Sequence, residues 1–296
     1  MSKALIFGIS GQDGYYLRQL LAAEGVTVTG VSRSPGPWHQ GDVADQNFVC
    51  ELIRKTQPDF IFHFAAQSSS SHDALWKNTA AIGQGTLAIL EAVRQHCRDC
   101  RVFSAGSALQ FRNDGCPINE QTPFAASSAY ALARIHATYA ARYYRSQFGV
   151  KAYVGYFFHH ESPRRPESHL SQKIARAAQR IAAGSQERLR LGRGEVRKEY
   201  NFAGDIVRAA WMLLQQDNID EVVIGCGCVH SIQEWADACF AAVGLDWQDY
   251  VDWQDGFTPE YAVLQSDPTL LFSLSWQAAV SFPELANMMV KGLDHG

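Results

Sequence analysis

The sequence predicts a doubly wound α/β domain, built on a parallel sheet and joined to a smaller, mostly helical lobe. Two observations predict this fold class. Short apolar runs alternate with segments of helical apolar periodicity from residue 4 to about residue 158. A glycine-rich turn, residues 8–14, separates the first apolar run from the first helical segment. The 296 residues suffice for one such domain and an added lobe, but not for two full doubly wound domains.

The first strand, turn and helix are the most clearly marked elements. Residues 4–7 are all apolar and lead directly into the turn. Apolar residues then recur at helical spacing over residues 16–21, and Gly25 is placed to end the helix. A second apolar run, residues 26–31, follows at once, and such a strand–helix–strand unit is typical of a parallel sheet.

The same alternation continues along the chain. Further strands are expected at residues 60–65, 102–105, 152–158, 189–191 and 222–224. Further helices are expected at residues 46–56 and at about 74–97, 128–148, 169–183 and 204–216. The chain from about residue 226 is expected to form helices and loops. We therefore assign residues 1–158 and about 199–225 to the first domain, and about 159–198 and 226–296 to the second lobe.

The composition is that of an ordinary globular protein and excludes several functions. Apolar residues make up 47% of the chain and charged residues 19%. A net charge of −4 provides no broad positive field for nucleic acid or anionic lipid, so we expect neither partner. The chain has no signal-peptide pattern and no run of about 18 apolar residues, so we expect a cytoplasmic protein without a membrane segment.

The seven cysteines are an odd number and lie scattered among the predicted elements, which favours reduced thiols over a disulfide framework. Cys97 and Cys100, which follow His96, and the distant pair Cys226 and Cys228 would allow a zinc site. A structural zinc needs four converging ligands, and the first pair falls where a helix gives way to a strand. We therefore favour simple packing of these side chains and expect no metal.

The turn after the first strand has the spacing of a dinucleotide-binding motif. Gly8 permits the tight turn, Gly11 a close approach of the backbone to pyrophosphate, and Gly14 close packing of the helix on the strand. Free N–H groups at the start of the helix would receive the phosphates. The alternative is a packing turn without a ligand. The turn residues expected to contact the cofactor are Gly8, Ser10, Gly11, Gln12, Asp13 and Gly14.

The end of the second strand favours NADP(H) as the cofactor. Many NAD enzymes have Asp or Glu there, but this chain has Arg33 followed by Ser34. An arginine beside hydroxyl groups suits a 2′-phosphate, although an exposed loop arginine is often only a solvated charge. The G-x-x-G-x-x-G spacing of the turn resembles that of the extended short-chain dehydrogenases, and this resemblance implies that Asp42 and Val43 flank the adenine.

A second pattern of the same class lies in the helix that begins near residue 128. Tyr130 and Arg134 resemble the Tyr-x-x-x-Lys of short-chain dehydrogenases, with Arg in place of Lys, and the four-residue spacing puts both on one helical face. The tyrosine would exchange a proton with the substrate oxygen. Arg134 could favour its phenolate and donate to ribose hydroxyls of the cofactor, but could not release a proton. Tyr130 and Arg134 are therefore also expected cofactor contacts. Ser107, just past a predicted strand, is the candidate that orients the oxygen. The alternative is an interior tyrosine beside a surface arginine.

Six segments carry a further resemblance: residues 8–14, 41–43, 66–68, 83–87, 120–124 and 160–165, of which the last, His-Glu-Ser-Pro-Arg-Arg, is the most specific. Together they resemble the GDP-mannose 4,6-dehydratase family, which has the Rossmann fold and takes part in deoxysugar biosynthesis. The resemblance implies a nucleotide-sugar substrate, most simply a GDP-linked one, and a homodimer. It also implies further cofactor contacts from Phe64, Ala65, Ala66, Gln67, Ser68, His160 and Arg165, and substrate contacts from His159, Glu161 and Lys198.

The chain departs from this family at the residue that dehydration needs. The family has Ser/Thr-x-Glu after the fifth strand, and this chain has Leu109 in place of the glutamate. Losing a general acid–base group typically costs about 10² to 10⁴ in rate. Three hypotheses remain: a 4-keto-sugar reductase, a dehydratase whose base has moved to Glu161 or His159, and a non-catalytic NADP(H)-binding protein. His159 itself replaces a family asparagine, and the loop from Ser34 to Gln40 is shorter than in the family.

Overall fold

A computed structural model describes residues 2–254 and 256–293 of the chain. The chain divides into two compact units. The first unit comprises residues 1–112, 119–157 and 207–224, and the second comprises residues 113–118, 158–206 and 225–296. The short segments 113–118 and 199–206, which the sequence analysis placed in the first domain, pack in the second unit. The reason is local pairing, because Asn113 donates a hydrogen bond to the Val263 carbonyl at 2.7 Å and residues 201–202 form a strand with residues 160–161.

The first unit is built on a parallel sheet that has seven strands within the described residues. The strands are β1 (Lys3–Phe7), β2 (Thr27–Ser32), β3 (His39–Gln40), β4 (Phe60–His63), β5 (Arg101–Ser107), β6 (Lys151–Phe157) and β11 (Glu221–Ile224). Their order is β11-β6-β5-β4-β1-β2-β3, and every neighbouring pair is parallel. The order reverses between β1 and β4, where the carboxyl ends of the strands leave a crevice for a ligand. The predicted doubly wound sheet is therefore confirmed.

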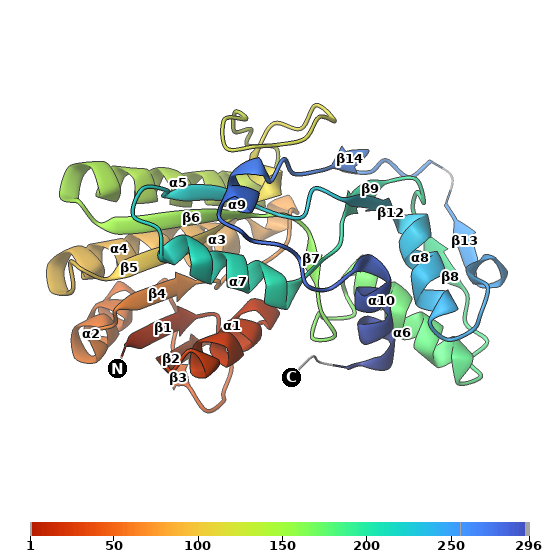
Figure 1. Ribbon diagram of the computed structural model, residues 1–296, viewed down its shortest axis with the longest axis horizontal. Helices are drawn as coiled ribbons and strands as arrows, with labels where there is room; N and C mark the ends of the chain where they lie inside the picture. Colours follow the sequence, from red (N-terminus) through yellow and green to blue (C-terminus); the bar gives the residue numbers. More distant parts are fainter. Residues whose placement is uncertain (1, 255, 294–296) are drawn as a thin grey trace. The chain divides into compact units, whose positions relative to one another are not determined.

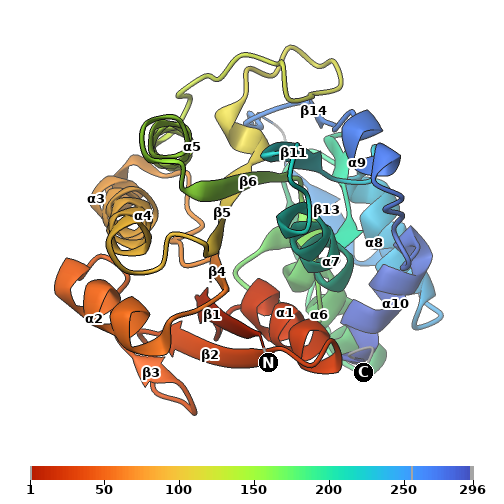
Figure 2. The same cartoon turned by 60° about the vertical axis from the view of Figure 1, so that its left-hand side comes forward.

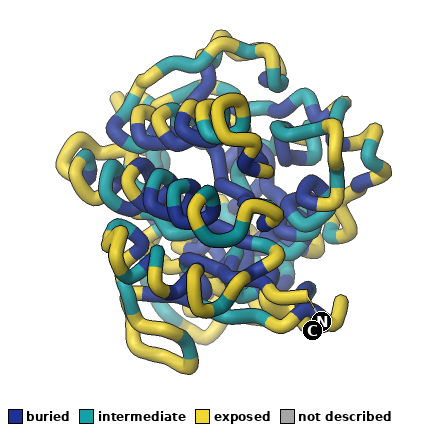
Figure 3. Tube along the Cα trace, turned by 90° about the vertical axis from the view of Figure 1, so that its left-hand side faces the viewer, coloured by how far each residue is buried: buried dark blue, intermediate teal, exposed yellow. Residues whose placement is uncertain are grey.

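Helices cover both faces of this sheet (Figures 1 and 2). One face carries α1 (Gln12–Ala23) and α7 (Ala203–Leu214), and the other carries α2 (Gln46–Thr56), α4 (Gly85–His96) and α5 (Ala129–Phe148). Local sequence sets their ends: the Asp45 carboxylate caps α2, the Ser128 hydroxyl caps α5, and Gly149, at a φ of 67°, ends α5. Buried residues follow the strands, whereas the outer helix surfaces are exposed (Figure 3).

Four elements of the first unit differ from the sequence prediction, and one of them, strand β3, was not predicted at all. The single helix expected over residues 74–97 is divided into η1 (His72–Ala74), α3 (Leu75–Asn78), a π-helical segment η2 (Thr79–Gln84) and α4. Two glycines accompany this irregularity, since a Cβ on Gly83 would lie 2.5 Å from Nδ1 of His136 and one on Gly85 would lie 2.9 Å from Val43. Strand β4 ends two residues earlier than predicted, and β5 runs two residues further, to Ser107.

The second unit packs three helices, α6 (Leu170–Ala182), α8 (Ile232–Ala241) and α10 (Phe282–Lys291), around the buried Trp235. Its other elements are β7 (His160–Glu161), β8 (Leu189–Leu191), β9 (Arg197–Glu199), β10 (Asn201–Phe202), β12 (Val229–Ser231), η4 (Trp247–Asp249), β13 (Val251–Trp253), β14 (Val263–Leu264) and α9 (Thr269–Ser273). The chain after residue 226 was predicted to form only helices and loops, and this was wrong. Its strands have two or three residues each, too few to show an alternating pattern.

None of the helices formed by the described residues is long and apolar enough to cross a membrane.

Candidate functional site

The glycine turn has the geometry that its motif requires. Gly8 adopts a φ of +92°, and a Cβ there would lie 2.8 Å from the backbone nitrogen of Ala65. A Cβ on Gly14 would lie 2.4 Å from the Gly8 carbonyl oxygen, so only glycine allows the helix to begin this close to the strand. Gly11 is the N-cap of α1, and it has no side chain to bond the first N–H groups of the helix. The turn is therefore shaped to bring backbone donors to an anionic ligand.

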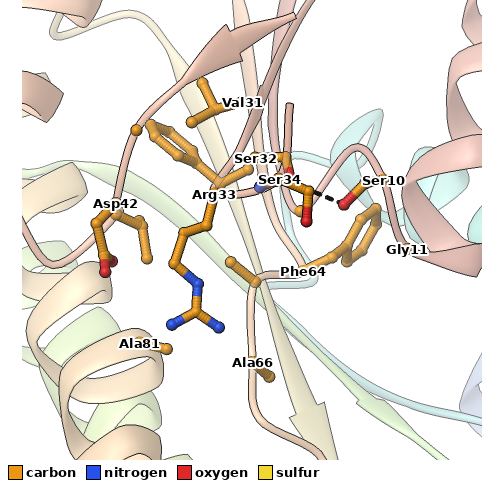
Figure 4. Close-up of a pocket in the computed structure, with 15 residues that line it drawn as sticks. Ser10, Gly11, Val31, Ser32, Arg33, Ser34, Asp42, Phe64, Ala66 and Ala81 are labelled. Carbon is orange, nitrogen blue, oxygen red and sulfur yellow. Dashed lines mark hydrogen bonds between the residues drawn. The ribbon is translucent and has the colours of Figure 1, made fainter. Parts of the chain in front are cut away.

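A pocket opens beside this turn, at the carboxyl ends of β1, β2 and β4 (Figure 4). It is lined by Phe7, Gly8, Ser10, Gly11, Val31, Ser32, Arg33, Ser34, Gly41, Asp42, Val43, Phe64, Ala65, Ala66 and Ala81. Ten of these residues are among the cofactor contacts that the sequence predicts. Gln12, Asp13 and Gly14 lie at the start of α1 and do not line it, and neither do Gln67 and Ser68. His160 and Arg165 belong to the second unit.

Arg33 is held so that its guanidinium points into the pocket (Figure 4). The residue before it, Ser32, is fixed by a hydroxyl–hydroxyl contact of 2.7 Å with Ser10, and its Oγ accepts the backbone N–H of Ser34 at 3.1 Å. Among the described residues, no carboxylate forms an ion pair with Arg33. The sequence analysis did not select Ser32, although its place at the end of the second strand was a usable signal. Ala81 carried no such signal.

Tyr130 and Arg134 contact each other directly. Nε of Arg134 donates to the Tyr130 hydroxyl at 3.0 Å, and Nη1 donates to the Ala105 carbonyl at the end of β5. Arg134 is only 5% exposed, which rules out the alternative of a surface arginine. Ser107 is buried at the end of β5, and its Oγ accepts the Leu109 N–H at 3.2 Å. Within the first unit, the structure therefore links β5 to the tyrosine through a buried guanidinium.

A buried histidine lies near this guanidinium. His63, at the end of β4, is 1% exposed and packs edge-on against Phe7. Burial, together with the positive charge of Arg134, lowers the pKa of His63 to about 4. His63 is therefore neutral at physiological pH.

The second unit contains a compact charged cluster, consisting of His159, Glu161, Arg165 and Lys198. Nε2 of His159 lies 2.8 Å from Nζ of Lys198 and 2.5 Å from Oε1 of Glu161, whose other oxygen accepts from Arg165 at 2.9 Å. Burial lowers the pKa of Lys198 to about 8, and burial together with the Lys198 charge lowers the pKa of His159 to about 3. Burial alone would raise the pKa of Glu161, but Arg165 and His159 hold it well below its usual range.

His160, beside this cluster, has its Nδ1 within 2.8 Å of the Phe158 carbonyl oxygen. The structure therefore brings together three of the predicted substrate contacts, His159, Glu161 and Lys198, and one predicted cofactor contact, Arg165.

The cysteines form no metal site among the described residues. In residues 2–254 and 256–293, no three side chains of His, Cys, Asp or Glu gather closely enough to hold a metal ion. All seven cysteines are free thiols, and Cys50 lies 3.2 Å from His96.

Comparison with known proteins identifies relatives along nearly the whole chain. The sequence profile of the GDP-mannose 4,6 dehydratase family matches residues 5–289. GDP-mannose 4,6 dehydratase 2 of Arabidopsis thaliana is 35% identical over 97% of this chain and 85% of its own length. GDP-mannose 4,6 dehydratase of Homo sapiens is 30% identical over 97% of this chain and 90% of its own length.

Solved structures share the fold at lower identity. RMD from Pseudomonas aeruginosa, complexed with NADPH, superposes with a TM-score of 0.87 at 19% identity, covering 99% of this chain and 98% of that one. The UDP-glucose 4-epimerase of Thermus thermophilus, complexed with NAD, gives a TM-score of 0.84 at 20% identity, covering 98% of both chains. The expected resemblance is confirmed: this chain belongs to the GDP-mannose 4,6-dehydratase family, among the extended short-chain dehydrogenases that modify nucleotide sugars.

Proposed function

We propose that this chain is an NADP(H)-dependent 4-keto-sugar reductase that acts at C4 of a GDP-linked hexose. The proposal depends chiefly on one observation, the hydrogen bond from Nε of Arg134 to the Tyr130 hydroxyl. This bond occupies an acceptor position of the phenol oxygen, so the phenol proton must be donated to another group. A keto oxygen of a bound sugar is such an acceptor. Reduction needs a proton donor of this kind and needs no carboxylate at position 109.

The roles of the three residues follow from this geometry. Tyr130 donates its proton to the keto oxygen as that oxygen becomes a hydroxyl group. Arg134 then stabilises the phenolate that remains, because its charge is permanent and its position is fixed by the Ala105 carbonyl. Ser107 orients the same substrate oxygen. Bound NADPH would supply the hydride that reaches the sugar carbon.

The pocket beside the glycine turn fits an NADP(H) molecule. The Gly8 and Gly11 backbone and the open N-terminus of α1 suit the pyrophosphate, and the free Arg33 guanidinium suits a 2′-phosphate. Asp42 and Val43 line the same pocket, where an adenine would be placed by the family resemblance. The relatives that bind NADPH or NAD support a nicotinamide cofactor, and Arg33 favours the phosphorylated one.

We assign the substrate's diphosphate to the cluster of the second unit. Lys198 and Arg165 supply positive charge there, and His159 lies within 2.8 Å of the Lys198 ammonium. The relatives are named for GDP-mannose, which supports a GDP-linked sugar. His160, on the neighbouring strand, remains a proposed cofactor contact by resemblance.

The cluster argues against a dehydratase with a relocated base. Glu161 is completely buried, one of its oxygens accepts from Arg165, and the other lies 2.5 Å from Nε2 of His159, so the carboxylate is not exposed to a sugar carbon. Nε2 of His159 is engaged by the Lys198 ammonium at 2.8 Å. The half-buried Leu109 has no acid–base group. We therefore place reduction ahead of elimination.

One set of assays tests the proposal. Purified protein is incubated with NADPH and the 4-keto-6-deoxy product of GDP-mannose, or with NADP and GDP-mannose, while both cofactor and sugar are followed. Consumption of NADPH with the keto sugar is expected. Loss of water from GDP-mannose without net change in cofactor would instead establish a dehydratase, and cofactor binding without turnover a non-catalytic protein. Tyr130→Phe should abolish turnover, and Tyr143→Phe, an exposed tyrosine on the same helix, should not.

We also propose a homodimer and a cytoplasmic location. Leu132, Tyr139 and Tyr143 are each about half exposed and follow one another on α5 at spacings of seven and four residues, which places an apolar stripe on one helical face. Light scattering should give twice the monomer mass, and Tyr143→Glu should halve it. The seven free thiols support a reducing compartment.

A further inference from the structure

A buried glutamine joins the segment that carries Ser107 to the helix that carries Tyr130. Gln110 ends the short helix η3 (Ala108–Gln110) and is 0% exposed. Its Oε1 accepts the Ser107 backbone N–H at 2.9 Å, and its Nε2 donates to Oγ1 of Thr138 at 3.1 Å. The Thr138 hydroxyl in turn donates to the Arg134 carbonyl at 3.1 Å. Three hydrogen bonds therefore run from the backbone of Ser107 to the backbone of Arg134, and we call this chain of contacts the Gln110 clamp.

The Gln110 clamp contacts the side of α5 that carries Tyr130. Tyr130, Arg134 and Thr138 follow one another at four-residue spacing, so they lie on one side of the helix. Arg134 already ties this side to β5 through the Ala105 carbonyl. Gln110 adds a second tie one turn further along, to the residue at which β5 ends. The two ties together fix the position of Ser107 relative to Tyr130.

Capping of η3 does not account for the whole arrangement. From the Gln110 side chain, the capping box of η3 needs only the contact between Oε1 and the Ser107 N–H. The contact between Nε2 and Thr138 lies outside that motif and spans 28 residues of sequence. The site also makes room for the amide, since a Cβ on Gly106 would lie 3.1 Å from Oε1 of Gln110. A buried amide is costly unless both of its ends are bonded, and here both are.

We propose that Gln110, acting through Thr138, is the residue that positions Ser107 against Tyr130, so that both hydroxyls reach one substrate oxygen. Gln110 touches no reacting atom in this role. The proposal rests on the reductase function assigned above. Small displacements of a positioned group, on the order of 1 Å, can cost about 10²-fold in rate. Loss of the clamp should therefore lower kcat and leave cofactor binding unchanged.

The test compares variants that keep side-chain volume but break the hydrogen bond between residues 110 and 138. Gln110→Met also removes the bond to Ser107, and Thr138→Val also removes the bond to Arg134. Gln110→Met and Thr138→Val should each lower kcat about 10- to 100-fold, with the KM for NADPH within about twofold of the wild-type value. The double variant should be no slower than the slower single variant, because both changes break the same contact. Thr138→Ser, which keeps the hydroxyl, should restore kcat to within about threefold of wild type.

A matched control separates positioning from folding. Thr56 of α2 donates to the Leu52 carbonyl at 2.7 Å, the same local bond that Thr138 makes, but it neither lines the pocket beside the glycine turn nor bonds Ser107, Tyr130 or Arg134. Thr56→Val should keep the wild-type kcat. Circular dichroism and NADPH titration at the assay temperature establish that each variant is folded.

The outcomes separate this proposal from the function on which it rests. If wild type turns over the keto sugar and Tyr130→Phe does not, but Gln110→Met and Thr138→Val keep full kcat, the clamp has no positioning role and the reductase stands. The same conclusion follows if Thr138→Ser is as slow as Thr138→Val. A folded wild-type protein without turnover overturns both proposals.

Discussion

Replacing Arg33 by alanine should weaken the binding of NADPH while leaving the binding of NADH unchanged. The Arg33 guanidinium points into the pocket beside the glycine turn, and Ser32 and Ser34 fix the loop that carries it (Figure 4). The two cofactors differ only in the 2′-phosphate, so a selective effect identifies the group that Arg33 contacts. The remaining lining of the pocket is shared by both cofactors.

The expected magnitude follows from the exposure of the side chain. Hydrogen bonds to charged groups contribute roughly 1.5–3 kcal/mol. Arg33 is exposed, so solvent and salt screen the contact, and we expect the lower end of that range. About 1.5–2 kcal/mol corresponds to a loss of roughly 10- to 30-fold in affinity. The loss should shrink as the salt concentration rises, because salt screens the attraction between Arg33 and the 2′-phosphate in the wild type and so reduces what the variant can lose.

Titration of NADPH and NADH fluorescence against wild-type and variant protein measures these affinities directly. Arg54→Ala is the matched control, since Arg54 is also an exposed arginine but pairs with Glu51 on α2, outside the pocket. It should leave both affinities unchanged. Equal losses for NADPH and NADH in Arg33→Ala, or no loss for either, would refute the assignment of Arg33 to the 2′-phosphate.

Three further predictions address the glycine turn, the buried His63 and Arg134. Gly14→Ala should lower stability by about 1–3 kcal/mol and the thermal midpoint by several degrees, because its Cβ would lie 2.4 Å from the Gly8 oxygen. Gly11→Ala, whose Cβ would lie 3.4 Å from the same oxygen, should change neither. Equal losses in the two variants would contradict the steric argument. The pKa of His63 is about 4 in the folded chain, against 6.5 when exposed. The free energy of unfolding should therefore include about 3 kcal/mol that is present above pH 6.5 and lost as the pH falls toward 4, because in that range the unfolded chain binds a proton that the folded chain does not. Urea unfolding between pH 7 and 4 should therefore show a shallower decline for His63→Phe than for wild type, and no change for the exposed His72→Phe. Arg134→Met should reduce kcat about 10²- to 10³-fold, and an unchanged kcat would remove Arg134 from the mechanism.

The parts of the fold that the sequence predicted are those specified by neighbouring residues. The glycine turn and the strands of the first unit are encoded within a few residues, because apolar periodicity and the absence of a Cβ act locally. The division of the helix expected over residues 74–97 was missed, since its cause lies in Val43 and His136, which contact the helix from elsewhere in the chain. The short strands of the second unit were missed because two or three residues show no periodicity.

Some residues of the candidate sites could likewise be predicted from local sequence, and others could not. The pocket residues at the ends of β1 and β2 were predictable, because parallel strands bring their carboxyl ends to one edge. Burial of Arg134 was not predictable from Tyr130 and the four-residue spacing, which describe a surface arginine equally well. Its environment depends on the Ala105 carbonyl, 29 residues away in the sequence. The contact between Lys198 and His159 spans 39 residues and leaves no local pattern.

These long-range contacts suggest what an arginine at position 134 can do that the lysine of the Tyr-x-x-x-Lys pattern cannot. A lysine at position 134 could hold the phenol and pass a proton, whereas the guanidinium of Arg134 is a rigid, permanently charged fork that donates to Tyr130 and Ala105 from two different nitrogens. Arg134 bonds both, and Gln110 ties the next turn of the same helix to Ser107. The chain thus replaces a mobile charge by a fixed one and strengthens the framework around it. Such a site suits the single proton donation to a keto oxygen that we propose, a step that needs no carboxylate at position 109.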